Sequence, residues 1–151
     1  MKKILTARVF GGLGNQLFIY AASKSLALLN NCELNLDVKS GYKNDKFNRK
    51  FNLSKFNIDC KLTGKLFWRA RISKYKQKFL KILNFKTNFL KTDTYFLSYL
   101  DPFYLENFKS ITVNSNKYIE GYWQSYKYFD QIDESLRKQL CLPKDLKLET
   151  K

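Results

Sequence analysis

The sequence predicts an α/β fold, a Rossmann-like parallel sheet with flanking helices. Two observations lead to this prediction. An apolar segment, Ile4 to Phe10, runs into a turn with three glycines and then into a helical pattern. A second strand-like segment, Glu33 to Val38, follows that helix. Strand, turn, helix and strand make a βαβ unit, in which the two strands lie parallel.

Each of these elements has its own signature. Ile4 to Phe10 is short and largely apolar, as expected of a buried strand. Asn15 to Asn30 is expected to be a helix, with Asn15 as its N-cap. Its apolar residues recur at helical spacing, namely Phe18, Ala22, Leu26 and Leu29. Glu33 to Val38 alternates apolar and polar residues, which is the period of a strand.

The middle of the chain is polar and basic. Residues 39–60 are rich in lysine and are expected to form a loop with short elements. Residues 61–91 carry ten Lys or Arg and no acid. An amphipathic helix is expected there, with an apolar stripe of Trp68, Ile72, Tyr75, Phe79 and Ile82. Such a helix would either pack one face on the core or lie on anionic lipid headgroups.

The last third of the chain predicts one more strand and one more helix. Lys117 to Gln124 has the aromatic and β-branched content of a strand. Ser125 or Asp130 is suited to cap a helix that reaches Leu140. Leu142-Pro143 would end that helix, because proline cannot continue it.

Composition bounds the class of protein. A chain of 151 residues suits one domain, and no apolar run approaches the length of a membrane span. Cys32, Cys60 and Cys141 are far apart and odd in number, which favours reduced thiols and a cytoplasmic location. Histidine is absent, so this sequence holds no histidine general base and no histidine zinc ligand.

The formal net charge of +15 invites a nucleic-acid or membrane function. Of the 28 basic residues only five are arginine, whereas recognition of bases favours the arginine fork. We therefore expect no nucleic-acid partner. A basic, non-catalytic module that binds nucleic acid or anionic membrane is kept as the alternative function.

The glycine turn is the strongest candidate for a site. Its glycines lack Cβ atoms, so a ligand can approach the backbone, and the free N–H groups of the next helix suit anionic or hydroxyl-rich ligands. A P-loop is excluded, because Asn15-Gln16 stands where it has Lys followed by Ser or Thr. Leu17 occupies the third glycine position of a dinucleotide fingerprint. Asp37 nevertheless keeps a nucleotide-binding oxidoreductase open as an alternative, since a ribose-binding acid would belong there.

Two segments carry a resemblance to a known family. They are Gly11-Gly12-Leu13-Gly14-Asn15-Gln16-Leu17-Phe18-Ile19-Tyr20-Ala21-Ala22 and Gly121-Tyr122-Trp123-Gln124-Ser125-Tyr126-Lys127-Tyr128-Phe129. With them the chain resembles the N-terminal half of the α-1,2-fucosyltransferases of bacterial surface polysaccharides and animal blood-group glycans. The likeness runs from about residue 4 to about residue 140. It is weakest across residues 61–110, which we interpret as a variable basic insertion.

The resemblance implies one lobe of a GT-B glycosyltransferase. Such enzymes transfer fucose from GDP-fucose to the 2-hydroxyl of a galactoside with inversion, and they require no metal. The family's donor motif, His-x-Arg-Arg-Gly-Asp, is missing from these 151 residues. We therefore expect a single N-terminal lobe over residues 1–151 that lacks the C-terminal donor-binding lobe and is inactive alone. A separate polypeptide is one way to complete it, and peripheral contact with the inner face of the membrane is a further expectation.

The resemblance also suggests site residues, each with a structural alternative. Gly12, Gly14 and the amide of Asn15 would border the cleft, and the side chains of Asn15 and Gln16 would bind sugar hydroxyls or else cap and pack the helix. Asp37 is the candidate catalytic base, because open α/β sheets present ligand groups where their strands end. Tyr122, Trp123 and Gln124 would form a wall against the sugar, although aromatic residues of a strand also build cores.

Overall fold

The computed structural model describes residues 3–64, 96–99 and 108–141. Its strands and helices are β1 (Ile4–Arg8), α1 (Leu13–Leu29), β2 (Glu33–Asp37), β3 (Lys61–Thr63), β4 (Phe96–Tyr99), β5 (Lys117–Gly121) and α3 (Asp133–Leu140). Single 3-10 turns occur at Leu53–Lys55, Tyr126–Tyr128 and Asp130–Ile132.

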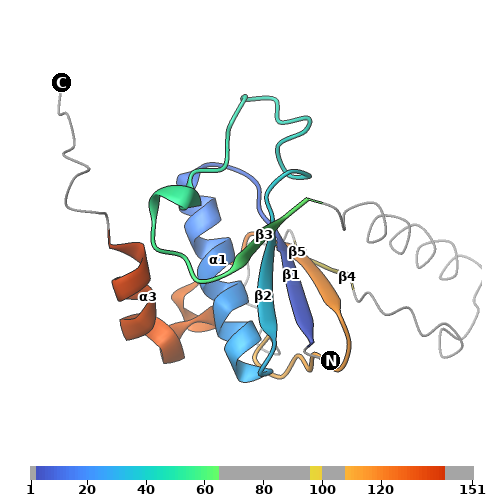
Figure 1. Ribbon diagram of the computed structural model, residues 1–151, viewed down its shortest axis with the longest axis vertical. Helices are drawn as coiled ribbons and strands as arrows, with labels where there is room; N and C mark the ends of the chain where they lie inside the picture. The colour runs from blue at the N-terminus through green and yellow to red at the C-terminus, as the bar shows by residue number, and fades with distance from the viewer. Residues whose placement is uncertain (1–2, 65–95, 100–107, 142–151) are drawn as a thin grey trace, which may run out of the picture.

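The described strands form one sheet in the order β3-β2-β1-β5-β4, and every described pair is parallel. This confirms the predicted α/β class and the βαβ unit of β1, α1 and β2. Because the strands are parallel, their carboxyl ends share one edge of the sheet. The turn after β1 and the long loop after β2 both leave from that edge (Figure 1). We call it the carboxyl edge, and the candidate site lies there.

The core lies between α1 and one face of the sheet (Figure 1). Leu5 and Ala7 of β1 are fully buried against the helix residues Ile19, Ala22 and Leu26, which are also fully buried. Each large aliphatic side chain removed from water in this way contributes about 1.5–3 kcal/mol. Alternation along the strands places polar side chains on the other face, among them Arg8 and Asp37.

Four predicted boundaries were wrong at the carboxyl edge. β1 ends at Arg8 instead of Phe10, and β2 ends at Asp37 instead of Val38. The helix begins at Leu13 rather than Asn15, because Gly12 takes the extended N-cap conformation (φ −72°, ψ 174°) and accepts the first helical bond from Gln16 N at 3.1 Å. Asn15 is therefore in the first turn and is not the N-cap. β5 ends at Gly121 instead of Gln124, and Trp123 beyond it has a positive φ of 52° that leaves the strand conformation.

The last helix begins later than predicted. Ser125 caps the 3-10 turn Tyr126–Tyr128, since its Oγ accepts a bond from Lys127 N at 3.4 Å. Asp130 opens a second 3-10 turn, and α3 begins only at Asp133. The short strands β3 and β4 were not predicted.

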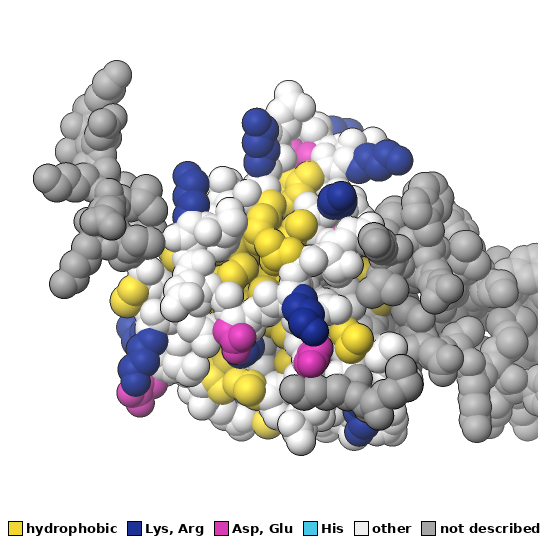
Figure 2. All heavy atoms as spheres, viewed as in Figure 1, with side chains coloured by type: hydrophobic (Ala, Val, Ile, Leu, Met, Phe, Trp, Pro, Cys, Tyr) yellow, Lys and Arg dark blue, Asp and Glu magenta, His cyan; other side chains and the backbone are white. Residues whose placement is uncertain are grey.

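The predicted helix with the Trp68–Ile82 stripe lies outside the described residues and stays a prediction. Within the described ranges, no helix has the combination of length and apolar character needed to cross a membrane. On the face drawn in Figure 2, the Lys and Arg side chains are scattered and do not gather in one patch.

Candidate functional site

Only one of the three glycines in the turn is required by the chain's own geometry. Gly11 has a φ of +80°, and a Cβ there would lie 2.7 Å from Nδ2 of Asn15. At Gly12 and Gly14 an added Cβ would meet nothing within 4 Å. Neither residue is in a left-handed conformation, so the fold itself does not demand a glycine at either place. The open space beside them is available to a ligand.

The start of α1 is exposed and uncapped. No side chain caps the helix, Leu13 is 41% exposed, and Gly14 is exposed as well. Among the described residues, the N–H groups of Leu13, Gly14 and Asn15 have no hydrogen-bond partner. Three unpaired donors at the positive end of a 17-residue helix dipole attract anionic or hydroxyl groups.

A hydrogen bond joins the two segments that carry the sequence resemblance. Gln124 Nε2 donates to Asn15 Oδ1 at 2.7 Å, across 109 residues of sequence. Gln124 is exposed and Asn15 is half-buried, so both amides are at the surface. The structure therefore places two of the predicted sugar-binding side chains together beside the glycine turn.

Gln16, the other predicted sugar-binding amide of the helix start, lies inside the protein and not at its surface. It is fully buried, and its Nε2 donates to Gly11 O at 3.0 Å and Lys50 O at 2.9 Å. Its Oε1 accepts a bond from Asn52 N at 2.8 Å. The side chain therefore fixes the glycine turn to the loop after β2 and presents no surface to a sugar.

Asp37 also lies inside the protein. It is fully buried, and its Oδ1 accepts bonds from Lys39 N at 3.1 Å and Ser40 N at 3.0 Å. Its Oδ2 accepts a bond from the Tyr118 hydroxyl at 2.7 Å, and burial raises the pKa of that phenol well above its usual value. A general base must reach the hydroxyl that it deprotonates. Asp37 instead organises the turn that leads out of β2.

The structure gives different positions to the three residues predicted to form a wall against the sugar, Tyr122, Trp123 and Gln124. Trp123 is 2% exposed and packs against Phe108 and Tyr128, with ring centroids 5.0 Å and 5.6 Å away. It belongs to the core. Tyr122 is half-buried at the carboxyl edge, where it forms a T-shaped ring pair with Phe10, with the two ring centroids 4.9 Å apart. Tyr122 and Gln124 thus remain at the site.

Sequence reasoning missed an ion pair at the same edge. Arg8 Nη1 donates to Glu120 Oε1, joining β1 to β5. The Arg8 guanidinium also bonds Ser40, through Nε to Oγ at 3.1 Å and through Nη2 to the carbonyl at 3.0 Å. The available signal was one arginine at the end of the first strand and one glutamate near the end of the last, residues of opposite charge in two short strands.

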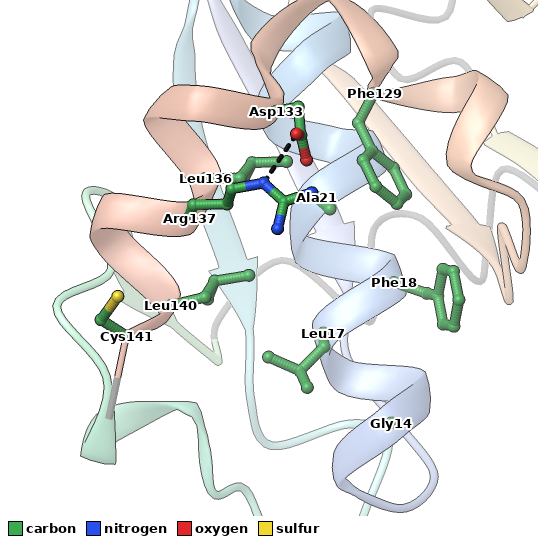
Figure 3. Close-up of a pocket in the computed structure, with 10 residues that line it drawn as sticks. All are labelled: Gly14, Leu17, Phe18, Ala21, Phe129, Asp133, Leu136, Arg137, Leu140 and Cys141. Atoms are coloured by element: carbon green, nitrogen blue, oxygen red, sulfur yellow. Dashed lines mark hydrogen bonds and ion pairs between the residues drawn. The ribbon is translucent and has the colours of Figure 1, made fainter. Parts of the chain in front are cut away.

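A hollow of about 630 Å³ lies between α1 and α3, and its walls are mainly apolar. Leu17, Leu136 and Leu140 line it, while Gly14 lies at one end (Figure 3). The Asp133 and Arg137 side chains at its rim bond each other at 2.7 Å. An apolar wall whose two charged groups are already paired offers little to a carbohydrate, so we do not assign the sugar site here.

Comparison with known proteins agrees with the resemblance read from the sequence. No family model matches the chain. An alpha-1,2-colitosyltransferase from Escherichia coli is 29% identical over 148 residues, which are 98% of this chain and 48% of the relative. The chain therefore spans about half the length of that curated relative.

A solved structure is also similar. It is a point mutant of FUT1 from Arabidopsis thaliana in complex with GDP, with a TM-score of 0.51 and 14% identity. The match covers 93% of this chain and 34% of that one, and at this identity it supports the fold alone. By sequence motifs, curated relative and fold together, the chain resembles the α-1,2-fucosyltransferase-like family of glycosyltransferases.

Proposed function

We propose that this chain forms part of an inverting glycosyltransferase that moves fucose, or a related deoxyhexose, from a GDP-activated donor to the 2-hydroxyl of a galactoside in surface-glycan synthesis. The name of the Escherichia coli relative and the GDP bound to the Arabidopsis thaliana neighbour support this chemistry. The observation that carries the proposal is the start of α1, where unpaired amides and two sterically unnecessary glycines leave an open site.

In this proposal the described lobe forms one wall of the substrate cleft. The N–H groups of Leu13 and Gly14 contact oxygen atoms of a substrate, while the amides of Asn15 and Gln124 bind sugar hydroxyls. The mutual hydrogen bond of these two amides leaves the Asn15 Nδ2 group and the Gln124 carbonyl for a ligand. Fixed donors and acceptors of this kind orient the acceptor hydroxyl for attack on the sugar's anomeric carbon.

Inverting transfer needs a base for the acceptor proton and cationic groups for the departing diphosphate. Asp37 does not have the access that the base requires. The 151 residues contain neither a histidine nor an Arg-Arg pair. We therefore propose that a second lobe supplies the diphosphate site and that the 151-residue chain alone performs no transfer. From the family resemblance, and not from these absences, we also propose that no metal takes part.

A chimera tests the proposal. Residues 1–151 of this chain are fused to the part of the Escherichia coli relative that lies beyond its matched 48%. We expect GDP release in the presence of GDP-fucose or its colitose equivalent and a galactoside, whereas the 151-residue chain alone gives none. Gly14→Leu fills the open space and should abolish the activity, while Lys138→Gln on the exposed side of α3 should leave it unchanged. A folded chimera without transferase activity, beside an active parent relative, would refute the proposal.

We further propose peripheral contact with anionic membrane through the Trp68–Ile82 stripe, which the sequence pattern supports. Flotation with anionic liposomes at low salt tests this contact. Failure of the 151-residue chain to float would refute it.

A further inference from the structure

A second hollow lies on the carboxyl edge beside the glycine turn. It has a volume of about 510 Å³ and lies within the loop that follows β2. We call it the loop pocket, and its lining residues are Val38, Tyr42, Asn48, Arg49, Lys50 and Phe51. It combines aromatic and aliphatic walls with polar groups, as small-molecule sites do.

The guanidinium of Arg49 is fixed before any ligand arrives. Its Nη2 and Nε donate to Asp45 Oδ1 at 2.6 Å and 3.0 Å. The Asp45 side chain is only 6% exposed, and its Oδ2 also accepts bonds from the backbone N–H groups of Phe47 and Arg49, at 3.1 Å and 2.9 Å. These bonds, above all that from the guanidinium, lower the pKa of Asp45 to about 2. A donor group held in this way loses little freedom on binding.

Arg49 still has binding capacity. Its side chain is 39% exposed, and among the described residues its Nη1 has no hydrogen-bond partner. The ring of Phe47 lies 4.7 Å from the guanidinium carbon and covers one face of the group. The free N–H groups therefore point along the plane of the fork, where they can donate to ligand oxygens.

Tyr42 supplies a second unused polar group. Its hydroxyl oxygen is shielded from solvent and has no hydrogen-bond partner in the described part of the chain. Burial raises the pKa of this phenol to about 12, so it stays neutral and can both donate and accept. Because Tyr42 lines the pocket, a small shift of its side chain would bring the hydroxyl to a ligand oxygen, which would supply the missing hydrogen bond.

The loop pocket is tied to the glycine turn. The buried amide of Gln16 bonds both Gly11 O in the turn and Lys50 O in the pocket lining. At the start of the loop, a Cβ on Gly41 would lie 1.9 Å from Val9 O, so the two backbones are in direct contact. One ligand can therefore extend from the glycine turn to the pocket.

We propose that the loop pocket is a subsite for an uncharged, hydroxyl-rich sugar unit of the acceptor glycan, with Arg49 and Tyr42 as its binding residues. This inference rests on the proposed function, because it assigns the acceptor to a place beside the glycine turn. Asp45 already neutralises the guanidinium charge, so the remaining N–H groups of Arg49 suit hydroxyl oxygens. The charge of Lys50, which is exposed at the same pocket, is the reason that the test below includes an anionic sugar. The rings of Tyr42 and Phe51 suit the apolar C–H face of a pyranose.

Direct binding tests the subsite without any need for catalysis. The 151-residue chain is titrated with lactose, a neutral galactoside, and with a disaccharide that carries a hexuronate, and NMR follows the protein resonances. We expect lactose to bind and to shift the Arg49 side-chain N–H signals. Arg49→Lys keeps the charge and the Asp45 pair but loses the fork, and it should weaken binding about tenfold, or about 1.4 kcal/mol. Tyr42→Phe should also weaken binding without loss of thermal stability, because its hydroxyl makes no bond in the fold.

Lys46→Gln is the matched control, since Lys46 is exposed on the same loop and does not line the pocket. Three results would overturn the inference: no lactose binding, lactose binding that neither variant changes, or tighter binding of the hexuronate that falls with salt. The chimera separates these results from the proposed function. If it transfers fucose with an unchanged KM for the galactoside in Arg49→Lys, the subsite is wrong and the transferase proposal stands. If the chimera is inactive while lactose still binds through Arg49, the transferase proposal is wrong and the sugar-binding role of the loop pocket stands.

Discussion

Replacing Gly14 by alanine is expected to stabilise the fold while it obstructs the site. The new methyl group meets no atom within 4 Å, so it introduces no clash. Gly14 is in the first turn of α1, and glycine within a helix is less stable than alanine by about 0.5–1 kcal/mol. For a chain of this size, 1 kcal/mol corresponds to a change in Tm of about 2–4 °C. We therefore expect Tm to rise by about 1–4 °C in a thermal unfolding experiment.

Gly11→Ala is the matched control in the same turn. Its φ of +80° and the 2.7 Å approach of Asn15 Nδ2 predict a loss of about 1–2 kcal/mol. Opposite shifts of Tm for two glycines three residues apart would confirm that the space at Gly14 is empty in the free protein. If Gly14→Ala lowers Tm as Gly11→Ala does, the space is filled by the protein itself. In that case the reasoning for a ligand site at the start of α1 fails.

Three further changes test the contacts around the site. Gly41→Ala places a Cβ 1.9 Å from Val9 O and should destabilise the protein by about 1–3 kcal/mol in urea unfolding, and wild-type stability would contradict the packing of the loop on β1. Gln16→Leu leaves Asn52 N and two carbonyls without their buried partner, so we expect a loss of about 1–3 kcal/mol, whereas a neutral effect would show that this amide does not fix the turn. Asp45 has a folded pKa of about 2, below its ordinary 3.8, so its contribution to stability is present above about pH 4 and is lost as pH falls towards about 2. The urea midpoint of the wild type should fall over that pH range more than the midpoint of Asp45→Asn. If the two midpoints fall equally with pH, the ion pair is contradicted.

The sequence predicted the parts of the fold that depend on local pattern. The period of two in Glu33 to Val38 and the helical spacing from Phe18 to Leu29 are set by backbone geometry, and both elements formed with their ends shifted by one or two residues. The exposed glycine turn was predicted for the same reason, since a strand end and a helix start must meet there. β3 has only three residues with mostly exposed side chains, so it carries no pattern that could reveal it.

The site residues were harder to predict because their roles depend on distant partners. Asn15 was assigned as a cap, but its side chain bonds Gln124, and no local rule relates residues so far apart. Gln16 and Asp37 are polar residue types that usually lie at surfaces, and their burial follows from three specific partners each. The Asp45–Arg49 pair is also four residues apart, but it lies in a loop, where this spacing does not by itself bring two side chains together as it does on a helix.

The most direct measurement of the central claim is the backbone NMR spectrum of the 151-residue chain during titration with a galactoside and with GDP-fucose. If the start of α1 is a substrate site, the amide signals of Leu13, Gly14 and Asn15 shift saturably, and Gly14→Leu removes the response. If both ligands leave these amides unchanged, or shift Gly14 only together with Leu136 and Leu140 of the hollow between α1 and α3 while Leu13 and Asn15 do not respond, the site has been placed wrongly.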